Sequence, residues 1–458
     1  MNKEKKYLLI AGDAIILYLS LFLTLAIRYS SDFNSYIWSR HLLPFTIIFL
    51  VWLIVFYIDD LYDLSFGQGL AGLLVKLVRG MIISVMVAAV FFYFTVDRLF
   101  TIKPQRVLLI HAIIATVILY LWRVGFSMFV RSPKRAQAIL FIGYNDLTGE
   151  VITKISSTPQ LGLQAKAILS SDNITLPSEF STLLAHGDYS TLKAICIEKK
   201  IGAIVSTVNP RQDTTLVKSL FECLPLKIDF YDITGFYEKI TGKIPVTLIE
   251  QVWFLENLTE NSKNLYERFK RVVEILFAIL LFGISLPFIP FIAFAIKISG
   301  PGPVFFVQKR VGKDGKIFSA VKFRTMIVGA EKNGPQWATQ NDQRITPVGK
   351  FMRKTRIDEI PQLINVIIGD MSLIGPRPER PEFVEQLQGQ IPFYKERLLV
   401  KPGLTGWAQV AGPAYGGSKE ESLEKLQFDL FYIKNRSIGL DISILLKTIR
   451  TVLSQKGQ

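Results

Sequence analysis

The sequence predicts a membrane protein in three parts: four N-terminal transmembrane helices, a small α/β domain, and a mainly helical domain that carries a re-entrant membrane helix hairpin. Half of the 458 residues are hydrophobic and the mean hydropathy is +0.33, as in integral membrane proteins with soluble parts. Long apolar runs gather in the first third, and strand-like and helical patterns alternate after it. We place the three parts at residues 1–130, 131–258 and 259–458.

The chain is strongly basic, with a formal net charge of +15. Such a charge suits the anionic cytoplasmic face of a membrane and phosphorylated substrates. No nucleic acid is expected as a partner, because no base-reading motif accompanies the charge. The two cysteines, Cys196 and Cys223, lack metal-ligand spacing, which favours reduced soluble parts in the cytosol.

The first part contains four apolar runs, each close to the ~20 residues that a helix needs to cross a bilayer. They lie at about Tyr7–Ile27, Leu43–Ile58, Gly80–Val96 and Val107–Trp122. Lys5 and Lys6 precede the first run and Arg123 follows the last, so both ends are expected in the cytoplasm. No small-residue cleavage site follows the first run, which predicts an anchor. Asp13 lies near the cytoplasmic end of that run, where we expect it to reach the interface.

The second part predicts a degenerate Rossmann-like domain. Short β runs such as QAILFIG and IGAIVST alternate with helical stretches, as in a parallel α/β sheet. The turn after the first run reads GYNDLTGEV. Asn145 stands where a dinucleotide-binding GxGxxG loop has its second glycine, and Thr148 where it has its third. The loss of these glycines weakens the case for a bound dinucleotide, and we expect a scaffold or regulatory domain.

The third part opens with an apolar segment, Glu274–Ile298, that is interrupted in its middle. Pro287 and Pro290 each remove an intrahelical hydrogen bond and bend the helix. Basic residues flank the segment on both sides, which places both ends in the cytoplasm. The pattern predicts a re-entrant helix over about 270–298, with the Ser285 hydroxyl near the freed backbone groups. The alternative is a kinked fifth span.

The two ends of this hairpin would lie at one membrane interface. We expect the side chains of Lys270 and Lys297 to meet anionic headgroups there. Phe288 and Phe291, beside the prolines, would lie deepest in the lipid.

Two adjacent carboxylates, Asp358 and Glu359, stand among basic residues in the third part. Arginine forks and lysine point charges recognise phosphate. The chain supplies four such candidates, Lys322, Arg324, Arg353 and Arg377. Two carboxylates amid cations suit a Mg²⁺-bridged diphosphate, since Mg²⁺ takes one or two carboxylates plus phosphate oxygens. DEIPQLINVI also predicts a helix start with Asp358 at or near the cap and Pro361 in the first turn, an end that attracts phosphate.

The spacing leaves two interpretations of the carboxylate pair open. Adjacent helical side chains diverge by about 100°, so one carboxylate can attack a substrate while the other holds a metal ion. In the other interpretation, Asp358 only caps the helix and Glu359 pairs with Arg356.

From about Lys263 to the C-terminus, the chain resembles the bacterial sugar transferase family, the monotopic phosphoglycosyl transferases. The resemblance rests on PGPVFFVQKRVG, KFRTM, RIDEIPQLINVIIGDMSLIGPRPER, KPGLTGWAQV and FDLFYIKNRSIGLDISILLKT. The whole chain resembles the long, multi-spanning polyisoprenyl-phosphate hexose-1-phosphate transferases in that family, more loosely over its first two parts. The break in the hairpin reads SLPFIP, where a plain Ser-Pro pair is common in the family.

This resemblance implies transfer of a sugar 1-phosphate from a UDP-sugar to undecaprenyl phosphate with release of UMP, the first step of exopolysaccharide, capsule or O-antigen synthesis. It implies that Asp358 is the nucleophile, forming an aspartyl phospho-sugar, and that Glu359 is a Mg²⁺ ligand. Lys322, Arg353 and Arg377 match the phosphate-binding positions of the family. It also implies a multi-pass protein of the bacterial inner membrane with the catalytic domain in the cytoplasm. The resemblance does not identify the sugar, although analogy favours glucose or galactose. It also leaves undecided whether the protein forms a homo-oligomer.

Two other classes fit less of the sequence. A membrane-anchored nucleotide-sugar dehydratase or epimerase could share the first two parts, and Tyr266 to Lys270 forms a YxxxK motif. No intact GxGxxG supports that class. A non-enzymatic protein of polysaccharide assembly or transport would need charged residues along a membrane pathway, and the apolar runs contain few.

Overall fold

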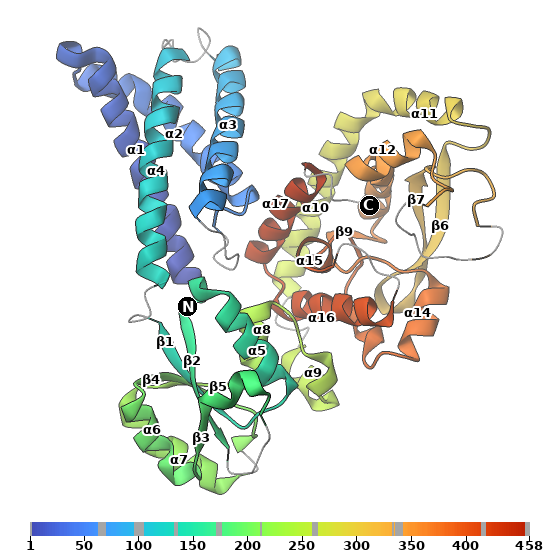
Figure 1. The fold of residues 1–458 in the computed structure, drawn as a ribbon. Helices are drawn as coiled ribbons and strands as arrows, with labels where there is room; N and C mark the ends of the chain where they lie inside the picture. The colour runs from blue at the N-terminus through green and yellow to red at the C-terminus, as the bar shows by residue number, and fades with distance from the viewer. Residues whose placement is uncertain are drawn as a thin grey trace. The chain divides into compact units, whose positions relative to one another are not determined.

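The structure, a computed structural model, describes residues 2–62, 70–95, 105–131, 136–170, 176–210, 213–258, 264–331, 334, 342–413 and 418–453. The chain divides into two compact units, Met1–Phe236 and Tyr237–Gln458 (Figure 1).

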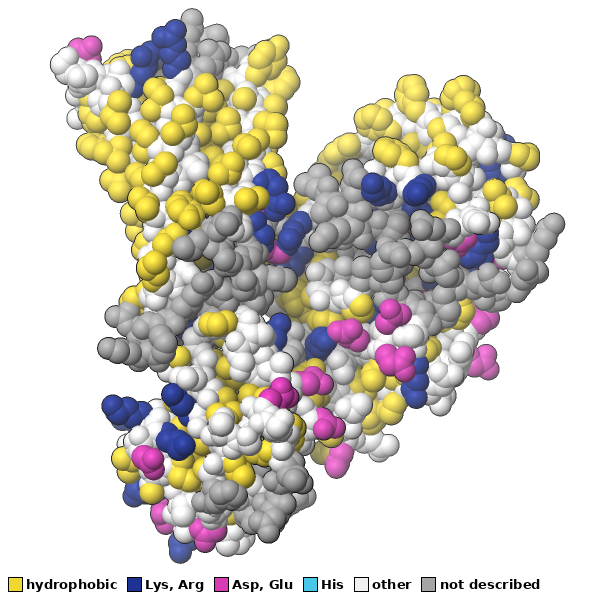
Figure 2. Space-filling view, in the orientation of Figure 1, with side chains coloured by type: hydrophobic (Ala, Val, Ile, Leu, Met, Phe, Trp, Pro, Cys, Tyr) yellow, Lys and Arg dark blue, Asp and Glu magenta, His cyan; other side chains and the backbone are white. Residues whose placement is uncertain are grey.

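The first unit begins with a bundle of long helices, which are α1 (Asn2–Tyr29), α2 (Ser35–Ile58), α3 (Leu70–Thr95) and α4 (Gln105–Arg131). Each is long and apolar enough to cross a membrane. Their large aliphatic and aromatic side chains, such as Leu17, Trp52 and Leu119, fill a shared core. Figure 2 shows that hydrophobic side chains also cover the outer face of these helices, as lipid-facing surfaces require.

A buried ion pair joins α1 to α4 inside this bundle. Asp13 is fully buried and pairs with Arg123, which is also buried. Arg123 donates a second hydrogen bond, of 2.6 Å, to the carbonyl of Leu61. The expectation that Asp13 reaches the interface is therefore wrong. A charge in an apolar bundle is tolerated when it is paired and hydrogen-bonded, and Arg123 provides both interactions.

The rest of the first unit is a parallel α/β domain, as predicted. Its five-stranded sheet has the order β3-β2-β1-β4-β5. The strands are β1 (Gln137–Ile142), β2 (Leu163–Ser170), β3 (Leu184–His186), β4 (Ile201–Ser206) and β5 (Asp229–Asp232). The helices are α5 (Asp146–Ser157), α6 (Leu192–Glu198) and α7 (Thr214–Cys223), and α8 (Ile233–Thr241) crosses into the second unit. The central strands β1 and β4 are almost wholly buried, as is typical of parallel sheets covered by helices.

The loop after β1 explains the departures from a dinucleotide-binding motif. Asn145 is the N-cap of α5, and its side chain accepts a 3.0 Å hydrogen bond from the backbone N–H of Thr148. The Thr148 hydroxyl accepts in return from the backbone N–H of Asn145, at 3.3 Å. This reciprocal capping box uses helix donors that would face a phosphate in a Rossmann loop.

The second unit combines a membrane-type helix pair with small sheets and short helices. The two strands β6 (Phe305–Val311) and β7 (Ile317–Phe323) form an antiparallel hairpin. The helices are α9 (Gln251–Asn257), α10 (Asn264–Ser285), α11 (Ile289–Ile298), α12 (Pro347–Thr355), α13 (Gln362–Ile368), α14 (Pro381–Gln388), α15 (Trp407–Ala411), α16 (Lys419–Asn435) and α17 (Ile438–Leu453). A short parallel pair, β8 (Ser372–Ile374) and β9 (Gly403–Thr405), lies at its centre.

The boundary between the units falls earlier than the predicted end of the α/β domain at 258. Ile244, Val246 and Ile249 are buried in the core of the second unit. The backbone N–H of Ile244 also donates a 3.1 Å hydrogen bond to the carbonyl of Gln427 in α16. The segment 237–258 is therefore an integral part of the second unit.

The predicted break in the apolar segment is present. The helix α10 ends at Ser285, a single 3₁₀ turn follows with Pro287 near its start, and α11 then begins with Pro290 in its first turn. The Ser285 hydroxyl donates a 2.7 Å hydrogen bond to the carbonyl of Phe282. Figure 1 shows α11 turning away from the axis of α10 at this point. Large apolar side chains on both helices are exposed, and so are Phe288 in the turn between them and Phe291 in α11.

The side chain of Lys270 is largely buried in the second unit and, contrary to expectation, does not extend outward to meet headgroups. Its ammonium donates a 2.5 Å hydrogen bond to the Tyr432 hydroxyl and lies 3.5 Å from a carboxylate oxygen of Asp441. Tyr266 donates to the same carboxylate, at 2.6 Å. The YxxxK pair is thus part of a buried polar network that joins α10 to α16 and α17. Lys297 is exposed at the end of α11 and is still expected to meet headgroups.

Candidate active site

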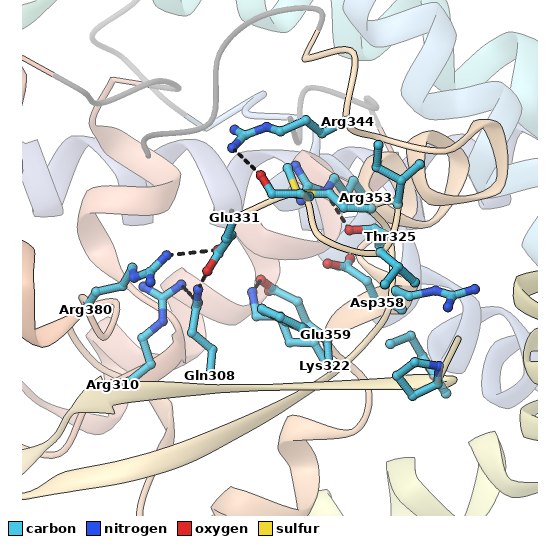
Figure 3. Close-up of a pocket in the computed structure, with 18 of the residues that line it drawn as sticks. Gln308, Arg310, Lys322, Thr325, Glu331, Arg344, Arg353, Asp358, Glu359 and Arg380 are labelled. Atoms are coloured by element: carbon cyan, nitrogen blue, oxygen red, sulfur yellow. Dashed lines mark hydrogen bonds and ion pairs between the residues drawn. The ribbon is translucent and has the colours of Figure 1, made fainter. Parts of the chain in front are cut away.

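A cavity of about 640 Å³ in the second unit brings the predicted site residues together (Figure 3). Asp358 and Glu359 line it, and the cationic residues predicted to bind phosphate line it as well. The cavity is formed by β6, β7, the chain that follows β7, the connection between α12 and α13, and the loop before α14. Its size is in the range of about 300–1,000 Å³ that is usual for small-molecule sites.

A sharp reversal of the chain presents the two carboxylates. The helix α12 ends at Thr355, and Arg356 adopts a left-handed conformation with φ of 59°. A 3₁₀ turn, Ile357–Glu359, follows, and α13 begins at Gln362. The helix thus begins later than predicted: Asp358 lies in the 3₁₀ turn, and Pro361, expected in the first helical turn, is the N-cap of α13. The chain reverses at Arg356 and forms a 3₁₀ turn before α13 begins, and both carboxylates of this turn line the cavity.

Three cations surround Glu359. Its Oε1 lies 2.8 Å from Nζ of Lys322 and 2.6 Å from Nη2 of Arg377. Its Oε2 lies 3.5 Å from Nη1 of Arg356, so the predicted alternative pairing also exists, as the longest of the three contacts. Burial opposes ionisation of Glu359, but the charges of Arg377, Lys322 and Arg356 outweigh it and hold the pKa of this carboxyl well below its usual range.

Asp358 is in a different electrostatic environment. Its side chain is buried, and its Oδ1 has no hydrogen-bond partner among the residues that the structure describes. Burial, and then the negative charge of Glu359, raise the pKa of Asp358 to about 6, although Lys322 and Arg353 oppose the change. Neighbouring carboxyl groups with separated pKa values are typical of sites in which the two groups have different roles.

Arg353 and Arg377, both predicted to bind phosphate, line the cavity with their guanidinium groups held differently. The Nε of Arg353 donates a 2.9 Å hydrogen bond to the Thr325 hydroxyl, which orients its guanidinium beside Asp358. The side chain of Arg377 is 36% exposed, so it can meet a ligand that enters from solvent.

Arg324, which was also predicted to bind phosphate, lines the cavity, but its guanidinium is held by main-chain carbonyls. Its guanidinium donates hydrogen bonds of 2.6 Å and 2.7 Å to the carbonyls of Pro301 and Gly300. A third bond, of 3.2 Å, reaches the carbonyl of Ile296 in the last turn of α11. The last carbonyls of a helix lack intrahelical partners, and a buried arginine fork can satisfy several of them at once.

A second polar group in the cavity was not predicted from the sequence. Oε1 of Glu331 accepts from Arg380 at 2.9 Å and from Gln308 at 3.3 Å (Figure 3). Arg310 donates to Gln308 at 2.5 Å. The alternation of Gln308 and Arg310 along β6, which places both on one face of the strand, was the signal available in the sequence.

The carboxylate pair is also compatible with a magnesium ion that binds both a carboxylate and the oxygens of a diphosphate. Among the described residues there is no group of three or more His, Cys, Asp or Glu arranged to hold a metal ion. Mg²⁺ at a phosphate site does not require such a group, since it often takes one or two carboxylates and completes its shell with phosphate and water. Glu359 can provide one ligand, because the protein contacts of its Oε2 are long, at 3.5 Å.

Comparison with known proteins identifies relatives over this unit and beyond. The model of the family "Bacterial sugar transferase" matches residues 265–455. A UDP-N-acetylgalactosamine-undecaprenyl-phosphate N-acetylgalactosaminephosphotransferase of Aeromonas hydrophila is 39% identical over 294 residues, which cover 60% of this chain and 67% of that protein. A UDP-glucose:undecaprenyl-phosphate glucose-1-phosphate transferase of Escherichia coli is 45% identical over 181 residues, 39% of each chain. A putative undecaprenyl-phosphate N-acetylgalactosaminyl 1-phosphate transferase of Bacillus subtilis is 50% identical over 133 residues, 29% of this chain and 74% of that protein.

Proposed function

Because the chain belongs to the bacterial sugar transferase family, we propose that it transfers a sugar 1-phosphate from a UDP-sugar to undecaprenyl phosphate and releases UMP. The observation that carries this proposal concerns Oδ1 of Asp358, which has no hydrogen-bond partner in the described part of the chain and lies in one cavity with Lys322, Arg353 and Arg377. A free carboxylate oxygen among phosphate-binding cations is the arrangement that attack on a diphosphate requires.

In the first half of the reaction, Oδ1 of Asp358 attacks the β-phosphorus of the UDP-sugar. The bond from that phosphorus to the bridging oxygen breaks, and UMP leaves with this oxygen and its electron pair. The sugar phosphate is then held on Asp358 as an acyl phosphate. In the second half, a phosphate oxygen of the lipid attacks the same phosphorus and the Asp358 carboxylate leaves. A covalent nucleophile divides one difficult transfer into two easier ones.

The environments of the two carboxyl groups support this division of roles. The oxygens of Glu359 are held by cations, whereas Oδ1 of Asp358 is free to form a bond. A pKa of about 6 leaves Asp358 mostly ionised at neutral pH, and more basic than an ordinary carboxylate.

The cations would bind and neutralise the diphosphate. Lys322, Arg353 and Arg377 line the same cavity as the nucleophile. Fixed charges of this kind stabilise a transferring phosphoryl group without reorganising during the reaction. Mg²⁺, held by Glu359 and oxygens of the diphosphate, would supply further neutralisation of that charge.

We also propose that the second unit lies on the cytoplasmic side of a bacterial inner membrane, with α10 and α11 as a re-entrant hairpin. The exposed apolar side chains of both helices, the break at Pro287 and the basic residues at both ends support this geometry. Asn264→Cys and Lys313→Cys, each in a background without Cys196 and Cys223, should both resist an impermeant thiol reagent in intact cells and react once the membrane is opened. Reaction of the Lys313 site alone in intact cells would establish a full crossing.

The activity is tested with purified full-length protein, undecaprenyl phosphate, Mg²⁺ and separate UDP-glucose, UDP-galactose, UDP-N-acetylglucosamine and UDP-N-acetylgalactosamine. We expect release of UMP and formation of a sugar-diphosphate lipid with at least one donor. Conversion of a UDP-sugar to another nucleotide sugar without the lipid would instead support a dehydratase or epimerase.

A further inference from the structure

The loop of residues 376–380 joins β8 to α14 and carries Arg377, the residue with the shortest contact to Glu359. Its sequence is PRPER, so Pro376 and Pro378 have no backbone N–H to donate. A loop with two prolines depends on its carbonyl groups for most of the hydrogen bonds that hold its main chain in place.

Four consecutive carbonyls of this loop each accept a hydrogen bond from elsewhere in the unit. The bonds run from Gly403 N to Pro376 O (2.8 Å), from Arg397 Nη2 to Arg377 O (2.9 Å), from Arg310 Nη1 to Pro378 O (3.0 Å), and from Val311 N to Glu379 O (2.9 Å). Two of the donors are backbone amides of strands or their flanks, and the other two are arginine side chains. The main chain of the loop is therefore fixed from both sides.

Arg397 is the donor to the carbonyl of Arg377 itself, and it is buried. Its Nη2 also donates to Oδ2 of Asp429 at 2.8 Å, and its Nη1 donates to the Tyr394 hydroxyl at 2.6 Å. Asp429, on α16, is 1% exposed. A buried charge is costly unless it is paired and hydrogen-bonded, and here three acceptors from three parts of the unit meet one guanidinium.

Arg397 and Asp429 do not belong to the described residues that line the cavity. They can therefore affect the reaction only through a residue that does line it. The carbonyl that Arg397 binds belongs to Arg377, whose side chain extends to Glu359.

We propose that Arg397, held by Asp429 and Tyr394, is a positioning residue that fixes the main chain of Arg377 and so the guanidinium that meets Glu359 and the diphosphate. The role in turnover rests on the proposed function, whereas the effect on the loop does not. Only a planar arginine fork can donate to all three acceptors at fixed angles, so lysine keeps the charge and loses the geometry. A displacement of a catalytic group by about 1 Å can cost about 100-fold in rate.

The first test uses the full-length protein and the release of UMP. Arg397→Lys should lower kcat/KM for the UDP-sugar at least tenfold. In a protein that already carries Arg377→Ala, adding Arg397→Lys should lower kcat/KM by less than a further factor of two, because the guanidinium that Arg397 positions is already absent. Arg436→Lys is a matched control, since Arg436 is a buried arginine that donates to a main-chain carbonyl, that of Ile433, and does not line the cavity. Full additivity of Arg397→Lys and Arg377→Ala would overturn the proposal.

The second test does not depend on activity. At a temperature where Arg397→Lys is folded, hydrogen exchange should be at least tenfold faster at the backbone amides of Gly403 and Val311, which donate to the carbonyls of Pro376 and Glu379, while exchange in α13 changes little. The melting temperature should fall as well, because the substitution removes hydrogen bonds of a buried arginine. If Arg397→Lys does not fold, Asp429→Asn removes the charge that holds the guanidinium and should shift both readouts in the same direction. Unchanged exchange in a folded variant would contradict the positioning role. A wild-type protein that releases no UMP from any donor would contradict the proposed function, and the exchange result would still decide the effect on the loop.

Discussion

Asp358 and Glu359 are neighbours in the chain, yet three cations surround the carboxyl of Glu359 while Oδ1 of Asp358 has no hydrogen-bond partner among the described residues. The 3₁₀ turn that carries both residues places them in one cavity but gives them different surroundings. One carboxyl is thereby kept ionised and oriented, and the other keeps a free oxygen. This asymmetry is the basis of the roles proposed for the pair.

The first prediction concerns pH. The pKa of Asp358 is raised to about 6 by burial and by Glu359, and the attacking form is the carboxylate, so the rate of the first half-reaction should rise with pH through about 6. Below that value it should fall about tenfold for each pH unit. The measurement is single-turnover release of UMP without the lipid, whose own phosphate titrates nearby. A rate that stays constant between about pH 5 and 7 would argue against Asp358 as the group that titrates.

A second prediction separates Glu359 from Asp358 by stability. Glu359→Gln leaves Lys322, Arg356 and Arg377 near one another without a counter-charge. Removing one partner of a buried pair can cost about 3–5 kcal/mol, and less is expected here because the cations partly reach solvent. The variant should lose activity, melt at a lower temperature and require more Mg²⁺ for nucleotide binding. An unchanged melting temperature would show that the cations do not depend on Glu359.

A third prediction compares two arginines of the same cavity. Arg324→Lys should lower the free energy of unfolding by roughly 1–3 kcal/mol, because lysine cannot donate to all three carbonyls that Arg324 binds. At a temperature where it is folded, its KM for the UDP-sugar should be near normal. Arg353→Lys should show the reverse, with a KM raised roughly tenfold and little change in melting temperature. Equal effects of both changes on KM would restore Arg324 to the phosphate-binding set.

The fourth prediction concerns where the catalytic unit begins. A chain of residues 237–458 keeps Ile244, Val246 and Ile249 in the core, and a chain of residues 264–458 loses them. Each fully buried aliphatic side chain contributes about 1.5–3 kcal/mol, so the longer chain should be the more stable by several kcal/mol. Thermal melting in the same detergent compares the two. Equal melting temperatures would mean that segment 237–258 is dispensable for folding.

The sequence predicted most of the elements because each has a local pattern. Apolar runs indicate α1 to α4, buried β runs indicate β1 and β4, and Pro287 marks the break after α10. The gathering of Asp358 and Glu359 with Lys322, Arg353 and Arg377 could also be predicted, because phosphate chemistry needs these residue types together.

The remainder depends on distant partners that no local pattern reveals. An arginine can bind either phosphate or main-chain carbonyls. The sequence around Arg324 does not reveal that its guanidinium reaches the carbonyl of Ile296 at the end of α11. Asp13 can be buried because it forms an ion pair with Arg123, which lies 110 positions away in the sequence. The helix start expected at Asp358 moves to Gln362 because Arg356 takes a left-handed conformation, which its sequence context does not indicate.

The central claim is that Asp358 forms a covalent bond to the transferred sugar phosphate, and mass spectrometry of the intact protein tests it most directly. Purified protein incubated with its UDP-sugar and Mg²⁺, without undecaprenyl phosphate, should gain the mass of one sugar phosphate and release one UMP. Fragmentation should place the added mass on Asp358, and undecaprenyl phosphate should remove it. Asp358→Asn should show neither the adduct nor release of UMP. At pH 8 its melting temperature should be equal to or higher than that of the wild type. The raised pKa means that ionisation of Asp358 destabilises the fold as pH rises through about 6, and asparagine has no charge to bury. Release of UMP at a normal rate by Asp358→Asn, or an adduct on another residue, would contradict the account.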